Sequence, residues 1–125
     1  MTQGNTRIAL VLTGVLVTVL TTTLDLQSAS AEGAARRDAV RQEQVVKDAL
    51  QHATEAVEHG KQGHAEKLVT HAEASLEQAM RGGTDPHSAE AITNLKQAIE
   101  HAKAGHADVA TKHAESAVTH LSQIK

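Results

Sequence analysis

The chain of 125 residues contains no cysteine, no phenylalanine, tyrosine or tryptophan, and a single proline. The absence of cysteine excludes disulfides, thiolate metal sites, a cysteine nucleophile and covalent haem attachment. The absence of aromatic side chains leaves no platform for base stacking, and a net charge of only −3 gives no field that would attract nucleic acid. The core must be built from Ala, Val, Leu and Ile, whose small side chains suit closely packed helices.

The first 31 residues have the composition of a secretory signal peptide. Arg7 precedes an apolar run from Ile8 to Leu20, and residues 29–31, Ala-Ser-Ala, fit the small-x-small pattern before a cleavage point. The apolar run has 13 residues, whereas a membrane-spanning helix needs about 20. We therefore predict that residues 1–31 are removed and that residues 32–125 form an exported domain. An uncleaved membrane anchor is the alternative.

The rest of the chain favours helix. From Val45 onward Ala, Glu, Lys, Gln and Leu dominate, and Gly and Pro occur only in clusters that end and begin helices. Asp85 followed by Pro86 has the character of an N-cap and a first helical residue. Residues 32–44 fit either an extension of the first helix or a loose arm. The four helices are expected near residues 35–60, 64–80, 86–103 and 106–124.

A shift of 42 residues superimposes one half of this region on the other. The segment "EHGKQGHAE" (58–66) aligns with "EHAKAGHAD" (100–108), and "HAEAS" (71–75) aligns with "HAESA" (113–117). Short turns make neighbouring helices antiparallel, so two such hairpins predict an all-α, antiparallel up-down-up-down four-helix bundle. The duplicated hairpins span residues 35–80 and 86–124. We expect a monomer, with a dimer that swaps hairpins as the alternative.

Nine histidines share one heptad position. When the residue after each histidine is placed at position a, positions a, d and e carry mostly Ala, Val, Leu and Ile and form an apolar face. The histidines then fall at g, beside that face: His52, His59, His64, His71, His87, His101, His106, His113 and His120. Facing g positions pair across the seam of an antiparallel hairpin. This predicts the pairs His59/His64, His52/His71, His101/His106 and His87/His120, with His113 opposite Asn94.

Paired imidazoles on adjoining helices predict metal sites. Successive pairs along the hairpin are about 10.5 Å apart, so each is expected to be an independent site. Asp48, Glu55 and Glu90 are the carboxylates at helical spacing from a histidine. The candidate sets are Glu55/His59/His64, Asp48/His52/His71 and His87/Glu90/His120. For Asp48 and Glu55 taken singly, a structural role on the helix surface is the favoured alternative. Imidazole with carboxylate suits Cu(II), Zn(II) and Ni(II), and the affinity order favours Cu(II).

A single histidine at such a half-exposed position is ordinarily a solvated polar residue. That explanation does not account for His64 and His106, which begin helices, where a positive charge is unfavourable and histidine is a poor cap. It also does not explain why histidine is used nine times where Lys, Glu or Gln would be better helix formers. The set as a whole therefore favours metal binding.

Three histidine-containing segments resemble a known family. "HATEAVEHGKQGH" (52–64), "HAEKLVTHAEASL" (64–76) and "HAKAGHADVATKHAESAVTH" (101–120) are similar to the seven-residue repeats of the small metal-binding proteins of bacterial periplasms. The resemblance implies a periplasmic four-helix bundle that binds several divalent metal ions, copper prominent among them. It also implies a role in metal scavenging, buffering or tolerance.

Other functions fit the sequence less well. P-loop, G-x-S-x-G and H-E-x-x-H motifs are absent, and no Asp or Glu lies three residues before a histidine, as a di-iron carboxylate bundle requires. We therefore do not expect an enzyme. The alternative is a pH-responsive periplasmic chaperone-like or structural helix bundle with no specific metal, because imidazoles gain charge near their ordinary pKa of about 6.5.

Overall fold

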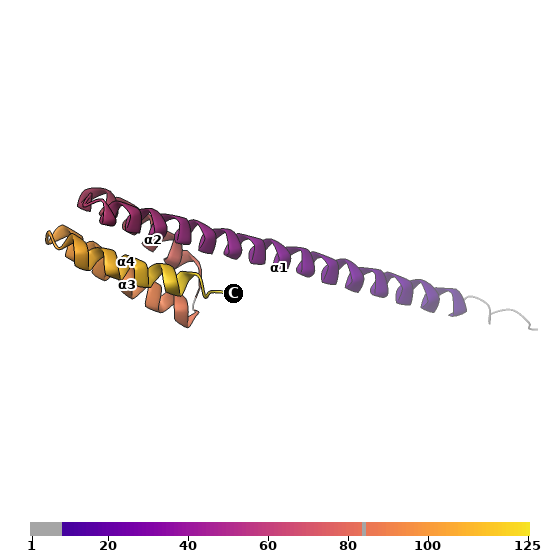
Figure 1. Cartoon of the computed structure of the whole chain (residues 1–125). Helices are drawn as coiled ribbons and strands as arrows, with labels where there is room; N and C mark the ends of the chain where they lie inside the picture. Colours follow the sequence, from indigo (N-terminus) through magenta and orange to yellow (C-terminus); the bar gives the residue numbers. More distant parts are fainter. Residues whose placement is uncertain (1–8, 84) are drawn as a thin grey trace, which may run out of the picture. The chain divides into compact units, whose positions relative to one another are not determined.

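The computed structural model describes residues 9–83 and 85–125, with the side chains of residues 29–83 and 85–125. Nearly all of these residues are helical, in α1 (Ala9–Lys61), α2 (Ala65–Arg81), α3 (Pro86–Lys103) and α4 (Ala107–Leu121) (Figure 1). Within those ranges there is no strand, and the all-α prediction is confirmed. No helix in the described part of the chain combines the length and apolar character needed to cross a bilayer.

The first helix is longer than predicted. It begins at Ala9, not near residue 35, and continues through residues 32–44. Ala, Arg, Glu and Gln, all good helix formers, fill that stretch, and Gly33 is its one glycine. Residues 32–44 are therefore helix and not a loose arm. The expected signal peptide, residues 1–31, lies almost entirely outside the described side chains, and its cleavage stays a prediction.

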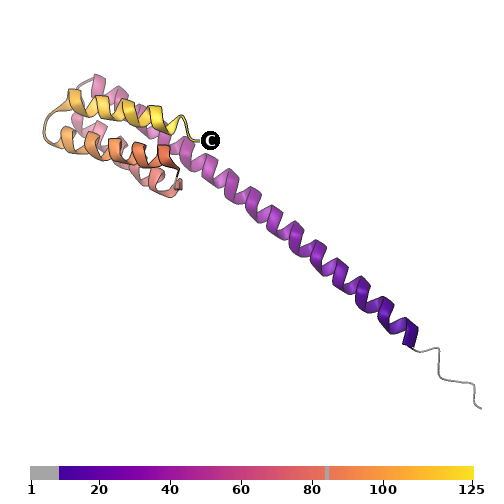
Figure 2. The ribbon, with the colours of Figure 1, turned by 90° about the horizontal axis from the view of Figure 1, so that it is seen from below.

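The chain divides into two compact units, Met1–Asp38 and Ala39–Lys125. The second unit contains the C-terminal part of α1 together with α2, α3 and α4, and it carries all nine histidines. Within it, α3 and α4 lie side by side along their length, and α2 also packs against α3 (Figure 2). The geometry below belongs to this unit.

The start of α3 is capped as the sequence predicts. The Asp85 carboxylate accepts a hydrogen bond of 2.7 Å from the backbone N–H of His87, and Pro86 occupies the first turn. This bond satisfies one of the N–H groups that a helix start leaves without an intrahelical partner. Asp85 therefore sets the point at which α3 begins.

The α1–α2 and α3–α4 connections are tight turns of the same form. The His64 N–H donates to the His59 carbonyl at 2.9 Å, and the His106 N–H donates to the His101 carbonyl at 2.8 Å. Gly63 and Gly105, just before the second histidine of each turn, have φ of 75° and 83°, a left-handed conformation that glycine adopts without strain. In both turns the two histidines are therefore held next to each other.

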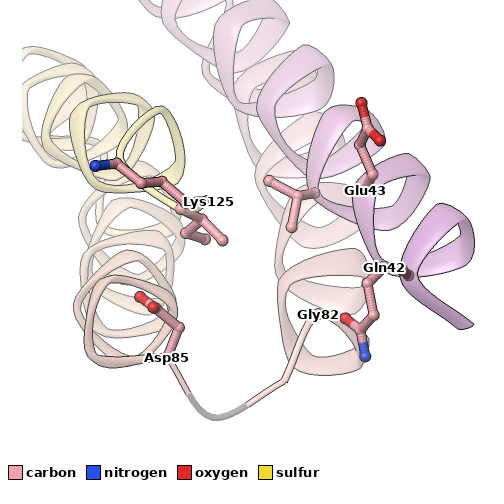
Figure 3. A pocket seen from close by; sticks show the side chains of 8 residues that line it. Gln42, Glu43, Gly82, Asp85 and Lys125 are labelled. Atoms are coloured by element: carbon pink, nitrogen blue, oxygen red, sulfur yellow. The ribbon is translucent and has the colours of Figure 1, made fainter. Parts of the chain in front are cut away.

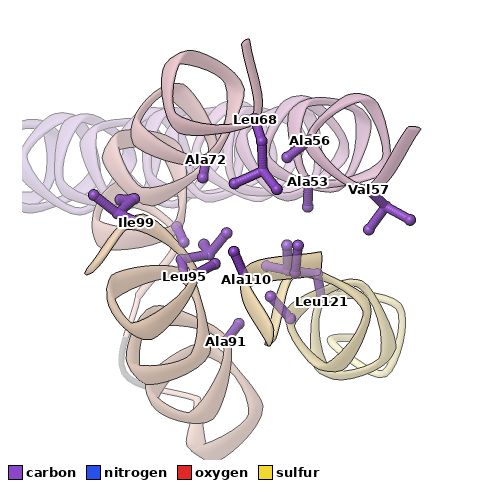
Figure 4. Close-up of a cluster of buried hydrophobic side chains, with 14 of the residues drawn as sticks. Ala53, Ala56, Val57, Leu68, Ala72, Ala91, Leu95, Ile99, Ala110 and Leu121 are labelled. Atoms are coloured by element: carbon purple, nitrogen blue, oxygen red, sulfur yellow. The ribbon is translucent and has the colours of Figure 1, made fainter. Parts of the chain in front are cut away.

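The predicted apolar face is buried. Alanine fills most of its a and d positions, and Leu68, Leu95 and Leu121 are the largest fully buried side chains (Figure 4). Residues at e are mixed: Val57 and Ile99 are buried, while others are half-buried at the edge of the core. A core of this composition is thin, because each alanine contributes one methyl group. The helix backbones are consequently able to approach closely.

Among the described glycines, Gly60, an a position of α1, is the one where an added methyl group meets its neighbours most closely. A methyl group there would overlap Thr111 Oγ1 of α4 and lie 2.7 Å from Leu68 Cδ1 of α2. The Thr111 hydroxyl is engaged in a 2.8 Å hydrogen bond to the Ala107 carbonyl, and Leu68 is fully buried. Neither side chain can withdraw without loss of packing or of a hydrogen bond.

We predict that Gly60→Ala lowers the free energy of unfolding by about 1–3 kcal/mol, the usual cost of overpacking a core, although alanine is the better helix former. Urea denaturation followed by far-UV circular dichroism measures the change. The double variant Gly60→Ala/Thr111→Ala should recover part of the loss, because it removes the atom that the new methyl group overlaps. A Gly60→Ala variant as stable as the unmodified protein would contradict this account of the packing.

Candidate metal centre

The nine histidines flank the core of the second unit. Seven are half-buried, whereas His64 and His106, at the two turns, are exposed. The four facing pairs expected from the sequence are each in ring contact. Their centroid separations are 5.9 Å for His59/His64, 5.9 Å for His52/His71, 6.1 Å for His101/His106 and 5.9 Å for His87/His120.

These separations fit the sharing of one ion by two rings. A metal–nitrogen bond is about 2.0 Å and the ring centroid lies about 1.2 Å beyond the nitrogen, so two imidazoles on one ion have centroids about 4.5–6.4 Å apart, depending on the bond angle. All four pairs lie inside that interval. Rotation about the bond to the ring, for which histidine has broad minima, changes the direction in which each ring nitrogen points.

Two further ring contacts run diagonally between neighbouring pairs. His59 and His71 have centroids 5.1 Å apart with ring planes at 19°, and His101 and His113 have centroids 5.2 Å apart with planes at 3°. Side chains on a helix lean toward its N-terminus, so His59, near the end of α1, leans away from the turn, and His71, on the helix that begins at the turn, leans toward it. Successive histidine pairs were expected about 10.5 Å apart, which is the rise of the backbone over seven residues. The rings of neighbouring pairs lie much closer than that, so the expectation is wrong for the side chains.

Glu55 joins His52 and His71 in one cluster. Its Oε2 lies 3.1 Å from His52 Nδ1 and 2.9 Å from His71 Nδ1, and each of the three side chains is about one-third exposed. Donor atoms of the three residues all lie within 4.8 Å of one another. Ligand atoms around a tetrahedral ion with bonds of about 2.0 Å are about 3.3 Å apart, so small movements suffice to place one ion among them.

The carboxylates are therefore distributed differently from the expectation. Glu55 lies with His52/His71 and not with His59/His64, because the spacing that matters is three residues after His52, not four before His59. Asp48, expected in that cluster, has its Oδ1 bonded to Gln44 Nε2 at 2.7 Å. Glu90 is exposed. In the described part of the chain, the three converging donors include neither Asp48 nor Glu90.

His113 is not isolated. Its Nδ1 lies 3.4 Å from the Asn94 Oδ1, the neighbour expected from the sequence. The parallel contact with His101 was not foreseen. The three residues His101, His106 and His113 thus form a chain of ring contacts, as do His59, His64 and His71.

The electrostatic environment changes the pKa of two candidate ligands, Glu55 and His59. The hydrogen bond from Gln51 Nε2, 3.1 Å long, lowers the pKa of Glu55, and its contacts with His52 and His71 lower it further. Burial lowers the pKa of His59 below its ordinary 6.5, and the nearby His71 adds to the effect. Glu55 is therefore anionic and His59 neutral near pH 7, the forms in which these groups bind metal.

Two ring nitrogens are buried without a hydrogen-bond partner among the described residues, His59 Nδ1 and His120 Nδ1. Buried polar atoms in native proteins nearly always have a partner, so an exception requires a reason. Each atom belongs to a ring that contacts another imidazole. A metal ion bound between the rings is a partner that these nitrogens fit.

Histidine is used at two helix starts without capping them. His64 and His106 occupy the N-cap positions of α2 and α4, and neither side chain makes a capping hydrogen bond. Ser, Thr, Asp and Asn are the residues that stabilise this position. The sequence thus forgoes helix stability at both turns, in contrast to Asp85 at α3.

We predict that His64→Ser raises the free energy of unfolding of the metal-free protein by about 0.5–1 kcal/mol, because the serine hydroxyl can accept a bond from an otherwise unpaired N–H of α2. Thermal denaturation in the presence of a chelator measures the change. His64→Ala is the matched control, since alanine cannot cap and should not stabilise. Equal stability of the two variants would mean that the turn does not admit a capping side chain.

A separate cavity of about 600 Å³ lies near the connection between α2 and α3 (Figure 3). It is bordered by Gln42 and Glu43 of α1, by Gly82 and Asp85, and by Lys125 at the C-terminus. No histidine lines it. It therefore supplies no imidazole to the clusters described above.

The helical unit with its clustered imidazoles defines a histidine-rich metal-binding bundle. Comparison with protein families agrees with that class: the family described as small metal-binding protein matches residues 10–124. The match covers most of the chain, and the chain belongs to the small metal-binding protein family. No curated protein matches it.

Proposed function

We propose that the protein binds several divalent transition-metal ions in the periplasm and serves to scavenge, buffer or tolerate them. The observation that carries the proposal is the convergence of Glu55, His52 and His71, contributed by α1 and α2, at distances close to those around a single ion. Two imidazoles and a carboxylate suit Cu(II), Zn(II) and Ni(II), and the general affinity order favours Cu(II).

The proposal includes an antiparallel bundle built from a duplicated hairpin. The turns at His59/His64 and His101/His106 have matching hydrogen bonds, and the ring separations recur after a shift of 42 residues. The diagonal contacts His59/His71 and His101/His113 recur in the same way. The proposal treats the protein as a monomer.

The proposed role is binding and not catalysis. The ligands in the Glu55 cluster are each about one-third exposed, so an ion bound there stays in contact with water and is able to exchange. A chain with several such clusters takes up ions as cargo. Near pH 7 the Glu55 carboxylate is anionic and the His59 imidazole is neutral, and these are the forms that bind a metal ion.

We predict that the unmodified protein binds more than one Cu(II) or Zn(II) ion at neutral pH, and that binding raises its melting temperature by linkage. Isothermal titration calorimetry and thermal denaturation measure the two effects. Glu55→Gln should alter the electron paramagnetic resonance spectrum of the bound Cu(II), because an anionic oxygen leaves one of the sites.

Asp48→Asn is the matched control. It removes a carboxylate that sequence spacing also places near His52 but that is bonded to Gln44, so the spectrum should not change. Binding of no more than one ion, or an unchanged melting temperature, would refute metal binding as the function.

Export through a cleaved signal peptide is the remaining part of the proposal. We predict that the chain expressed in a Gram-negative host is recovered from the periplasm with Glu32 as its first residue. Intact-mass measurement tests this. Ala29→Leu/Ala31→Leu should block cleavage, since large side chains do not fit the small-x-small pattern. Recovery of the periplasmic protein with residues 1–31 still attached would show that this segment is not a cleaved signal peptide.

A further inference from the structure

His71 belongs to two clusters at once. It contacts His52 and Glu55 on one side, with a centroid separation of 5.9 Å and a 2.9 Å contact to the carboxylate. On the other side it lies against His59, with centroids 5.1 Å apart, and His59 in turn contacts His64. Two positions for an ion therefore adjoin in the α1–α2 pair. One is the Glu55 position (His52, Glu55, His71) and the other is the turn position (His59, His64, His71).

A neutral imidazole has one nitrogen lone pair for a metal, because its other nitrogen carries a proton. His71 can complete the coordination of an ion at the Glu55 position or at the turn position. To serve both it would have to lose its remaining N–H proton. Without His71, each position retains only two protein ligands. In addition, two divalent cations on either side of one ring repel each other.

We propose that the α1–α2 pair holds one fully coordinated ion at a time, and that occupation of either position withdraws His71 from the other. This inference rests on the proposed metal binding and specifies how two of its sites are coupled. While an ion occupies one position, the other stays empty but able to bind. If the ligands other than His71 are removed from the occupied position, the ion moves to the other position and is not released.

The α3–α4 pair lacks this arrangement and supplies an internal control. Forty-two residues after the turn position lie His101, His106 and His113, with closely similar ring separations of 6.1 and 5.2 Å. At the places equivalent to His52 and Glu55 the chain has Asn94 and Gln97. His113 contacts the Asn94 side chain there, so it has no second cluster to serve.

The test counts Zn(II) ions on the full chain by native mass spectrometry, at a free Zn(II) concentration that fills the three-histidine cluster of α3–α4. His59→Gln/His64→Asn removes the turn position, and His52→Asn/Glu55→Gln removes the Glu55 position by installing the residues found 42 positions later. His101→Gln/His106→Asn is the matched control in α3–α4. Far-UV circular dichroism verifies that each variant folds, as expected for half-buried or exposed sites.

We expect that neither α1–α2 variant changes the number of bound ions, that their combination lowers it by one, and that the control alone lowers it by one. Loss of an ion from either α1–α2 variant alone would show that the two positions fill independently or form a single site, and would overturn the coupling while metal binding stands. Failure of the unmodified chain to bind Zn(II) or Cu(II) would instead remove the proposed function itself.

Discussion

The small volume of the core is the constraint on which the metal centre depends. Alanine at most a and d positions leaves little bulk between the helices, and at Gly60 even a methyl group would not fit. Residues at g flank this core, so their reach across the seam is set by the distance between backbones. Imidazole is short, and the pairs meet only because the helices are close. A core of aromatic side chains would separate the helices and the rings together.

Much of this could be predicted from the sequence because it follows from local rules. The glycine-containing turns, the Asp85 cap and the apolar face depend on residues a few positions apart, and they appear where periodicity and capping preferences place them. The start of α1 was missed because no residue stops the helix between Leu20 and Val45. The partner of Glu55 was missed because heptad counting treats facing residues as level. Real side chains lean along the helix, which joins His71 to His59 and brings it to the carboxylate.

The two halves preserve their packing more closely than their ligands. Leu68 aligns with Ala110 and Ala53 with Leu95 after the 42-residue shift, so each helix pair keeps one leucine and one alanine, and all four are fully buried. An exchange of this kind conserves core volume, which is the condition that cores tolerate best. The ligand positions follow no such constraint: Glu55 aligns with Gln97 and His52 with Asn94. The buried positions are therefore shared, and these differences between the candidate clusters lie at half-buried or exposed positions.

Histidine is placed in this chain at the expense of ordinary stabilising interactions. In the part of the chain that the structure describes, two N-cap histidines make no capping bond and two buried ring nitrogens have no hydrogen-bond partner. Each defect is small in free energy. In the proposed function an ion bound between the rings offsets it, since a ligand that binds only the folded state stabilises that state. The metal-free bundle is thus less stable than its helices would allow. The proposed metal binding therefore couples folding to occupancy through the same imidazoles.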